Sequence, residues 1–295
     1  MHKRVKIDAP AKINLSFAIT GKRPDGYHLV DSVMQTVTLY DTITISRMSG
    51  KGIFISCDRP GIPCNEENVA HLAARYFFDA FGAPDGALSI EIQKRIPEQA
   101  GLGGGSTDAA GVLAGLHSLL EVDAGIERLC EIGAKVGADV PFCLLGGTQR
   151  ARGIGEQFEN LPTLPDCEIL IAKPRAGIST PESYRRYDQL ENPQQPDIDR
   201  LLALLQAGSL PALAQAMGNV LEAVAQLPEI PQLRRIMEQN GALGSLMSGS
   251  GSAVFGIFDS KRTAKRCMRK LYNHAEGVFL VKPAQRGAWV FELQD

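Results

Sequence analysis

Apolar and polar residues alternate along the first third of the chain in the way expected of strands. Residues 5–15 and 29–45 are rich in β-branched side chains and partly alternate, and the segment 21–26 between them contains an Asp-Gly turn signal. Residues 53–56 and 88–92 predict two more short strands. The first two segments are therefore predicted to be strands of an antiparallel sheet.

Apolar residues at helical spacing predict several helices. Residues 66–81 carry such a stripe, with Asn65 as N-cap and Gly82 as the C-terminal stop. The residue before Pro141 disfavours the helical region, so Val140-Pro141 is expected to be an extended turn. Further helices are expected at 107–120, 127–136, 197–207, 209–225, 229–240 and 260–273.

The second half of the chain alternates strands with these helices. Strands are expected at 168–172, 242–247, 253–258 and 277–281. This pattern predicts an α+β domain with its helices on one face of a sheet. Two prolines within residues 161–165 indicate a hinge or a domain boundary, and 295 residues suit two domains.

Composition narrows the class of protein. The formal net charge of −2 does not suggest a nucleic-acid-binding protein. No apolar run approaches the roughly 20 residues that a membrane span requires. Six scattered cysteines without a Cys-x-x-Cys pair predict reduced thiols and a cytoplasmic location. The spacing of Cys57, Cys64 and His71 fits no common zinc pattern.

A glycine-rich loop is the sharpest local feature of the chain. Residues 101–108 read Gly-Leu-Gly-Gly-Gly-Ser-Thr-Asp and lead into a predicted helix. The glycines allow close approach to the backbone, and free N–H groups and the helix dipole favour an anion there. The loop lacks the lysine of a Walker A motif. It is also not a complete dinucleotide-binding motif, because Ser106 stands where that motif has its last glycine or alanine. It predicts a phosphate site, with a flexible or tightly packed turn as the alternative.

Two charged residues have the chemistry that phosphoryl transfer needs, namely a carboxylate that accepts a proton and a nearby cation. Asp139 lies just past a predicted helix, and Lys12 interrupts an apolar strand. Spacing alone does not show that the two side chains meet. An ordinary turn aspartate and an edge-strand lysine remain open as interpretations.

Several motifs together resemble the superfamily of galactokinase, homoserine kinase, mevalonate kinase and phosphomevalonate kinase (GHMP kinases). Three blocks match in order, at 10–15, 97–110 and 244–258. More narrowly, the chain resembles the branch that acts in the non-mevalonate (MEP) pathway of isoprenoid precursor synthesis. The residues that carry this narrower resemblance are 10–15, 23–28, 39–41, 94–97, 101–110, 137–141 and 248–252.

The resemblance implies a fold and a division of the chain. The fold is expected to be α+β with two domains and an active site in the cleft between them. Residues 1–158 would form a ribosomal-protein-S5-domain-2-like domain that binds ATP and carries the catalytic residues. Residues 159–295 would form a ferredoxin-like domain. The sequence does not indicate an oligomeric state.

The resemblance also implies roles for individual residues. Asp139 would deprotonate the acceptor hydroxyl, and Lys12 would keep Asp139 ionised and stabilise the transferred phosphoryl group. Mg²⁺ is expected to arrive with ATP, without an assigned protein ligand. ATP would contact Pro97, Glu98, Gln99, Ala100, Gly101, Leu102, Gly103, Gly104, Gly105, Ser106 and Thr107, with Asn68 and Val69 on the adenine side. The substrate would meet Asn14, Tyr27, His28, Thr180, Pro181 and Tyr184, near a third glycine loop formed by Gly249, Ser250 and Gly251.

The implied substrate is a small molecule, a cytidine diphosphate conjugate of methylerythritol. Tyr27 would stack on cytosine and His28 would bond to its polar edge. Homoserine and mevalonate kinases are the nearest alternatives, although their acceptors carry no base. An RNA-binding module is the alternative from another class. The basic cluster at 261–270 has the pattern of an amphipathic surface helix, so neither nucleic acid nor membrane is expected as a partner.

Overall fold

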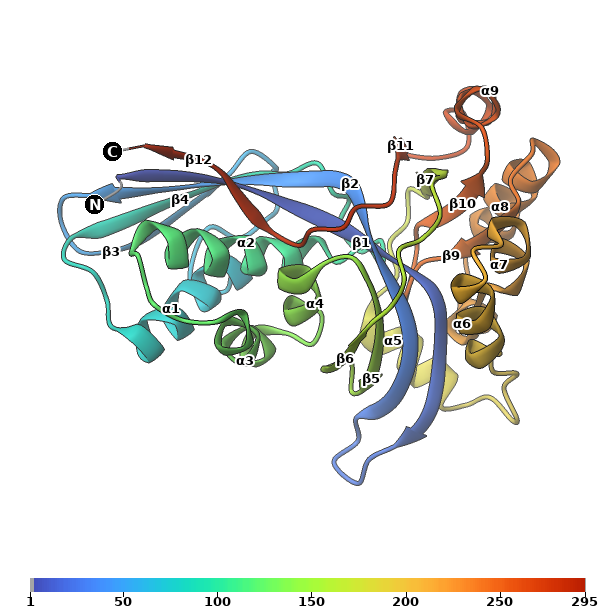
Figure 1. The fold of residues 1–295 in the computed structure, drawn as a ribbon, viewed down its shortest axis with the longest axis horizontal. Coiled ribbons are helices and arrows are strands. Elements are labelled where there is room, and N and C mark those ends of the chain that lie inside the picture. The colour runs from blue at the N-terminus through green and yellow to red at the C-terminus, as the bar shows by residue number, and fades with distance from the viewer. Residues whose placement is uncertain (1–2, 295) are drawn as a thin grey trace.

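The computed structural model describes residues 3–294, which form two β-sheets with helices packed against them (Figure 1). Within that range the first sheet has eight strands. They are β1 (Arg4–Lys22), β2 (His28–Met48), β3 (Gly52–Cys57), β4 (Ala87–Gln93), β5 (Thr148–Gly153), β6 (Gln157–Asn160), β8 (Gly218–Asn219) and β12 (Trp289–Gln294). The main path runs β12, β1, β2, β4, β3; β5 pairs with β2 and β6, and β8 pairs with β1.

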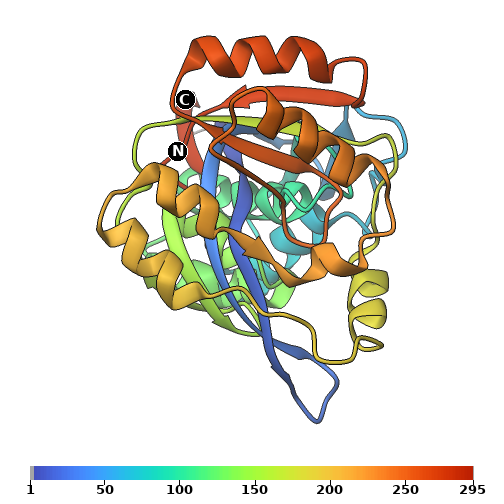
Figure 2. The ribbon, with the colours of Figure 1, turned by 90° about the vertical axis from the view of Figure 1, so that its right-hand side faces the viewer.

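The long hairpin of β1 and β2 connects the two parts of the molecule. Both predicted strands are confirmed and extend further than expected. Alternate residues of β1 up to Leu15 are fully buried, as in a strand with one face on a core. The predicted Asp25-Gly26 turn closes the hairpin, with the Gly26 N–H donating to the Arg23 carbonyl over 3.0 Å. The hairpin end projects beyond the helices (Figure 2).

Helices cover one face of the first sheet (Figure 1). They are α1 (Val69–Phe81), α2 (Gly104–Leu119), α3 (Ile126–Val136) and α4 (Val140–Leu145). Helix α1 begins later than predicted, because Asn68 rather than Asn65 caps it by accepting from the Ala70 N–H. Helix α2 begins three residues earlier than predicted, so the end of the glycine loop is already helical.

The extended turn predicted at Val140-Pro141 is wrong. Both residues open α4, with Asp139 as its N-cap. Proline is tolerated in a first helical turn, where its missing N–H would have no intrahelical partner. Since residues 140–144 are buried, α4 fixes Asp139 at the end of a rigid segment.

The second sheet contains β7 (Glu168–Lys173), β9 (Gly244–Met247), β10 (Val254–Phe258) and β11 (Gly277–Val281). The order is β11, β7, β10, β9, and all neighbours are antiparallel. Helix α8 (Glu229–Gln239) leads into β9, and α9 (Lys261–Leu271) joins β10 to β11. This is a ferredoxin-like arrangement, so the predicted two-part α+β fold class is confirmed.

Helices lie on both faces of the second sheet, not on one face as predicted. Helices α8 and α9 pack on the face that contains Leu170, Val254 and Phe258. Helices α6 (Ile198–Gln206) and α7 (Leu210–Ala216) pack on the opposite face. The second half of β1 is buried in that same core, which therefore belongs to both parts of the molecule.

The single helix predicted for residues 209–225 is also wrong. That segment divides into α7, β8 and the short helix η1 (Val220–Val224). Gly218 pairs with Ser16 of β1, and the Asn219 amide donates to the carbonyls of Met247 and Gly249. These contacts with other elements outweigh the local helical pattern.

The C-terminal segment returns to the first sheet, where β12 pairs with β1. The expected domain boundary between residues 158 and 159 falls inside β6, which pairs with β5. That division of the chain therefore stays a prediction. The described helices are all too short or too polar to cross a lipid bilayer.

Candidate active site

A cavity of about 1120 Å³ lies where the two parts of the molecule meet. This volume slightly exceeds the roughly 300–1,000 Å³ typical of small-ligand sites. Its wall is formed by β1, β2, the glycine loop, α5 (Thr180–Tyr187) and the loop 248–252. The predicted site residues that line it are Lys12, Asn14, Tyr27, His28, Val69, Pro97, Glu98, Gln99, Ala100, Gly101, Leu102, Gly103, Gly104, Gly105, Ser106, Asp139, Thr180, Pro181, Tyr184, Gly249, Ser250 and Gly251.

The glycine loop presents the start of α2 to this cavity. Gly101 and Gly103 adopt left-handed backbone conformations, with φ of 71° and 73°. A Cβ on Gly101 would stand 1.9 Å from the carbonyl oxygen of Ser248, so no larger residue fits. No side chain of residues 3–294 caps the first turn of α2, which begins at Gly104. Its free N–H groups and the helix dipole therefore favour an anion such as phosphate.

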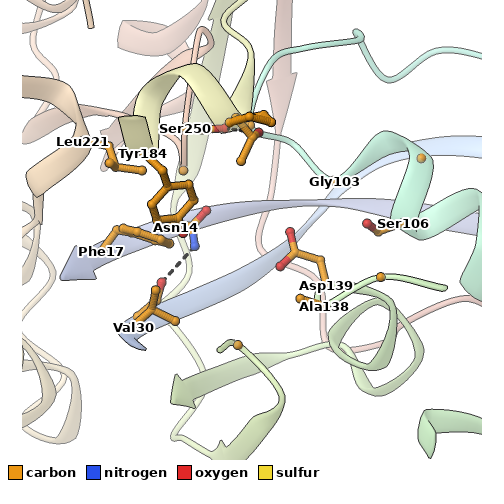
Figure 3. Close-up of a pocket in the computed structure, with 18 of the residues that line it drawn as sticks. Asn14, Phe17, Val30, Gly103, Ser106, Ala138, Asp139, Tyr184, Leu221 and Ser250 are labelled. Atoms are coloured by element: carbon orange, nitrogen blue, oxygen red, sulfur yellow. Dashed lines mark hydrogen bonds between the residues drawn. The ribbon is translucent and has the colours of Figure 1, made fainter. Parts of the chain in front are cut away.

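Lys12 and Asp139 meet in the cavity, with 3.2 Å between Nζ and Oδ2. The Lys12 side chain is 7% exposed and the Asp139 side chain 36% exposed. A register shift between β1 and β2 after Pro10 lets the Lys12 N–H donate to the Leu102 carbonyl over 3.0 Å, which ties β1 to the glycine loop. Figure 3 shows the Asp139 carboxylate pointing into the cavity, with Ser106 on one side.

Asn14 holds Lys12 in this position. Its Oδ1 accepts from Lys12 Nζ over 2.8 Å, and its Nδ2 donates to Ser32 Oγ over 2.8 Å. The backbone N–H of Asn14 donates to Ser248 Oγ, which itself donates to the Gly101 carbonyl. The cation, the glycine loop and the loop 248–252 thus form one hydrogen-bonded unit.

Aromatic residues form the end of the cavity away from the glycine loop (Figure 3). Tyr184 stacks on His28 with 4.7 Å between ring centroids, whereas Tyr27 at the hairpin turn is 61% exposed. The Thr180 hydroxyl lies 2.7 Å from the Ser250 hydroxyl, which joins α5 to the loop 248–252. Burial raises the pKa of Tyr184, so its hydroxyl stays neutral.

Two of the expected ATP-binding residues lie outside the cavity lining. The fully buried Thr107 donates its hydroxyl hydrogen to the Pro10 carbonyl over 2.8 Å. The Asn68 side chain accepts from the Ala70 N–H and donates to the Pro63 carbonyl. Their side chains therefore hold neighbouring segments in place.

Lys94 lines the cavity and was missed as a site residue by the sequence analysis. Its side chain is 2% exposed, and Nζ lies 2.5 Å from Asp41 Oδ2 and 2.6 Å from Asp108 Oδ2. It also lies 3.4 Å from the Gly104 carbonyl at the start of α2. Burial alone would lower the pKa of Lys94, but the charges of the two carboxylates raise it. The motif of residues 94–97, a short distance before the glycine loop, was the available signal.

The chain matches two family models. The model of the GHMP kinases N terminal domain matches residues 68–147, and the GHMP kinases C terminal model matches residues 201–277. A 4-diphosphocytidyl-2-C-methyl-D-erythritol kinase of Caldicellulosiruptor bescii is 42% identical over 269 residues, 90% of this chain and 94% of its own. One of Bacillus pumilus is 39% identical over 281 residues, 95% of this chain and 96% of its own.

Solved structures agree with these matches. A crystal structure of 4-(cytidine 5'-diphospho)-2C-methyl-D-erythritol kinase has a TM-score of 0.79 at 33% identity, over 95% of this chain and 99% of the other. A homoserine kinase from Cytophaga hutchinsonii has a TM-score of 0.82 at 21% identity, over 99% and 98%, and so shares the fold. The chain therefore belongs to the GHMP kinases, a family of ATP-dependent small-molecule kinases, and within them to the 4-diphosphocytidyl-2-C-methyl-D-erythritol kinases.

Proposed function

We propose that the chain uses ATP to phosphorylate the 2-hydroxyl of 4-diphosphocytidyl-2-C-methyl-D-erythritol, in the non-mevalonate (MEP) route to isoprenoid precursors. The observation that carries the proposal is the Lys12–Asp139 pair, 3.2 Å apart, in the same cavity as the uncapped start of α2. The names of the relatives support this choice of substrate. All six cysteines lie within the described residues and are unpaired, which supports a cytoplasmic location.

The cavity residues divide the chemistry between them. The N–H groups at the start of α2 and the Ser106 hydroxyl bind the phosphates of ATP. Asp139 takes the proton of the acceptor hydroxyl as that oxygen bonds to the γ-phosphorus and ADP departs. Lys12, whose Nζ lies 3.2 Å from Asp139 Oδ2, holds the Asp139 carboxylate in place and stabilises negative charge on the transferred group.

Mg²⁺ is proposed to enter with ATP, and the residues present fit such an ion. Ser106 and Asp139 offer hydroxyl and carboxylate oxygens to the cavity, which are ligands that Mg²⁺ prefers. Residues 3–294 contain no cluster of three or more His, Cys, Asp or Glu side chains suited to a metal. An ion held mainly by phosphate and water oxygens is consistent with both facts. When bound, it would neutralise phosphate charge.

The aromatic end of the cavity supports the cytidine part of the proposal. Tyr27 is exposed enough to stack on a base, and His28 and Thr180 offer polar atoms to the same cavity. Homoserine and mevalonate have no base to contact these side chains. The diphosphate would then lie between the base and the glycine loop.

ADP release by the purified protein tests the proposal. The assay contains ATP and Mg²⁺ with 4-diphosphocytidyl-2-C-methyl-D-erythritol, mevalonate, homoserine or no acceptor. We expect turnover above background with the cytidine substrate alone. Turnover with mevalonate or homoserine instead would refute the proposed substrate while leaving the kinase chemistry intact.

Asp139→Asn tests the assigned proton acceptor. We expect kcat to fall by about 10²-fold or more, because the amide cannot take the hydroxyl proton, while the Kd of ATP stays within a few-fold. Steady-state kinetics and calorimetric ATP titration measure the two quantities. Asp85→Asn, at an exposed position outside the cavity, is the matched control. Near-normal turnover of Asp139→Asn would show that another group accepts the proton.

A further inference from the structure

Asp188 bridges α5 and the β1–β2 hairpin at the aromatic end of the cavity. Its Oδ2 lies 2.5 Å from Lys22 Nζ, and its Oδ1 lies 2.6 Å from His28 Nε2. Asp188 is the C-cap of α5, where the helix dipole disfavours an anion. Its two partners on the hairpin, rather than its own helix, therefore explain why a carboxylate stands there.

The His28 ring is held in one orientation. It stacks on Tyr184 at an interplanar angle of 24° and meets Tyr187 edge-on, with centroids 6.1 Å apart. The His28 side chain is only 10% exposed, and His28 lines the cavity. Its Nε2 is engaged by Asp188, while Nδ1 has no hydrogen-bond partner among residues 3–294. Nδ1 is therefore the ring nitrogen left for a ligand.

The carboxylate of Asp188 decides which ring nitrogen carries the hydrogen. Hydrogen bonds from Lys22 and then from His28 lower the pKa of Asp188, so the group is ionised at neutral pH. An ionised carboxylate only accepts hydrogen bonds, so the hydrogen must sit on His28 Nε2. In the neutral ring, Nδ1 is then an acceptor. Lys22 already balances the charge of Asp188.

We propose that Asp188 is a positioning residue that makes the site select cytosine over uracil. By keeping the His28 hydrogen on Nε2, it leaves Nδ1 to accept from the exocyclic amino group of cytosine. Uracil has a carbonyl at that place, which would oppose the Nδ1 lone pair and leave both acceptors unpaired. The inference rests on the proposed function, since it requires cytidine at this end of the cavity. Asp188 acts through His28 and does not touch the base.

The test compares the binding of CDP and UDP to the wild-type protein, Asp188→Asn and Asp166→Asn by titration calorimetry. Asp166 is the matched control, because it pairs with Lys282 at an exposed site outside the cavity. We expect the wild-type protein and Asp166→Asn to prefer CDP. In Asp188→Asn the ratio of the Kd for UDP to the Kd for CDP should fall by roughly tenfold, mainly through weaker CDP binding. The reason is that an amide can either accept or donate a hydrogen bond, so it no longer fixes the hydrogen on His28 Nε2.

Nitrogen NMR of labelled histidine supplies a readout that a purely structural role would not change. His28 should show hydrogen on Nε2 alone in the wild-type protein and a mixture of tautomers in Asp188→Asn. A wild-type protein that discriminates between CDP and UDP, with the same ratio in Asp188→Asn, would refute the role of Asp188 alone. A doubly protonated His28 at neutral pH would do the same. A wild-type protein that binds CDP and UDP equally would refute the selection of cytosine, and one that binds neither nucleotide would overturn the cytidine substrate as well.

Discussion

Asp41 and Asp108 both approach the Lys94 ammonium group beneath the glycine loop, but they have unequal surroundings. Asp41 also accepts from the backbone N–H groups of Arg95 and Ile96. The Oδ1 of Asp108 is buried without a hydrogen-bond partner in the described part of the chain. Burial raises the pKa of Asp108 to about 8, against the opposing charge of Lys94. Of the two carboxyl groups, Asp108 is the one we expect to hold a proton near neutral pH.

A raised pKa makes stability depend on pH, which Asp108→Asn tests. The stabilisation from a proton on Asp108 is complete below the unfolded pKa of about 4 and is lost as pH rises towards 8. Between pH 6 and pH 8 the wild-type protein should lose about 2 kcal/mol of unfolding free energy relative to Asp108→Asn. Urea unfolding at both pH values measures this. Groups common to both proteins cancel in the difference, so parallel pH curves would show that Asp108 is ionised throughout.

The glycine loop and the loop 248–252 come from different parts of the molecule and hold each other in place. The N–H of Ser252 donates to the Gln99 carbonyl and the N–H of Ala253 to the Ala100 carbonyl, over 3.1 Å each. The Ser248 hydroxyl donates to the Gly101 carbonyl over 2.8 Å. The start of α2 is therefore positioned by backbone contacts as well as by its own sequence, and we expect the phosphate site to be rigid before ATP binds.

Gly101→Ala tests that arrangement. Its Cβ would meet the Ser248 backbone at 1.9 Å on a residue with φ of 71°, so one of the two loops must move. We expect the Kd of ATP to rise by about tenfold or more, measured by calorimetry. Gly208→Ala has a similar φ of 67° but open space around it, so it carries the backbone strain without the clash. Equal ATP affinity in the two variants would mean that the loops adapt freely.

Long periodic segments were predictable, whereas elements defined by distant partners were not. The strands of the hairpin and helices such as α3 carry their own pattern over many residues. The strands β5, β6 and β12 and the helix α5 were missed, since they are short and depend on neighbouring elements. In the site, the residue types of Lys12 and Asp139 suggested their chemistry, but only the fold brings them together. Phe17, Val30 and Leu221 line the cavity although their apolar side chains look like ordinary core in the sequence.

At the scale of the whole molecule, the C-terminal segment connects the second sheet to α4, the helix that follows Asp139. After β11 the chain passes α4, where the Ala288 N–H donates to the Cys143 carbonyl over 2.7 Å. It then continues as β12, whose Trp289 meets Tyr40 edge-on at 5.2 Å between centroids. Because α4 begins directly after Asp139, the contact between the C-terminal segment and α4 helps to hold the proposed proton acceptor in position.

Gly287→Ala should therefore affect catalysis at a distance from the cavity. A Cβ at this position would lie 2.2 Å from the Leu144 carbonyl oxygen, which pushes the C-terminal segment and α4 apart. A displacement of Asp139 by a fraction of an ångström weakens its alignment with the acceptor hydroxyl, so we expect kcat to fall by about tenfold or more. The glycine loop leads into α2 and not into α4, so the KM for ATP should change little. Steady-state kinetics with Gly277→Ala as control, where only the Phe279 ring is in the way, separates this effect from a general loss of stability. If Gly287→Ala lowered the melting temperature but kept the wild-type kcat, the C-terminal segment would support the fold and not the position of Asp139.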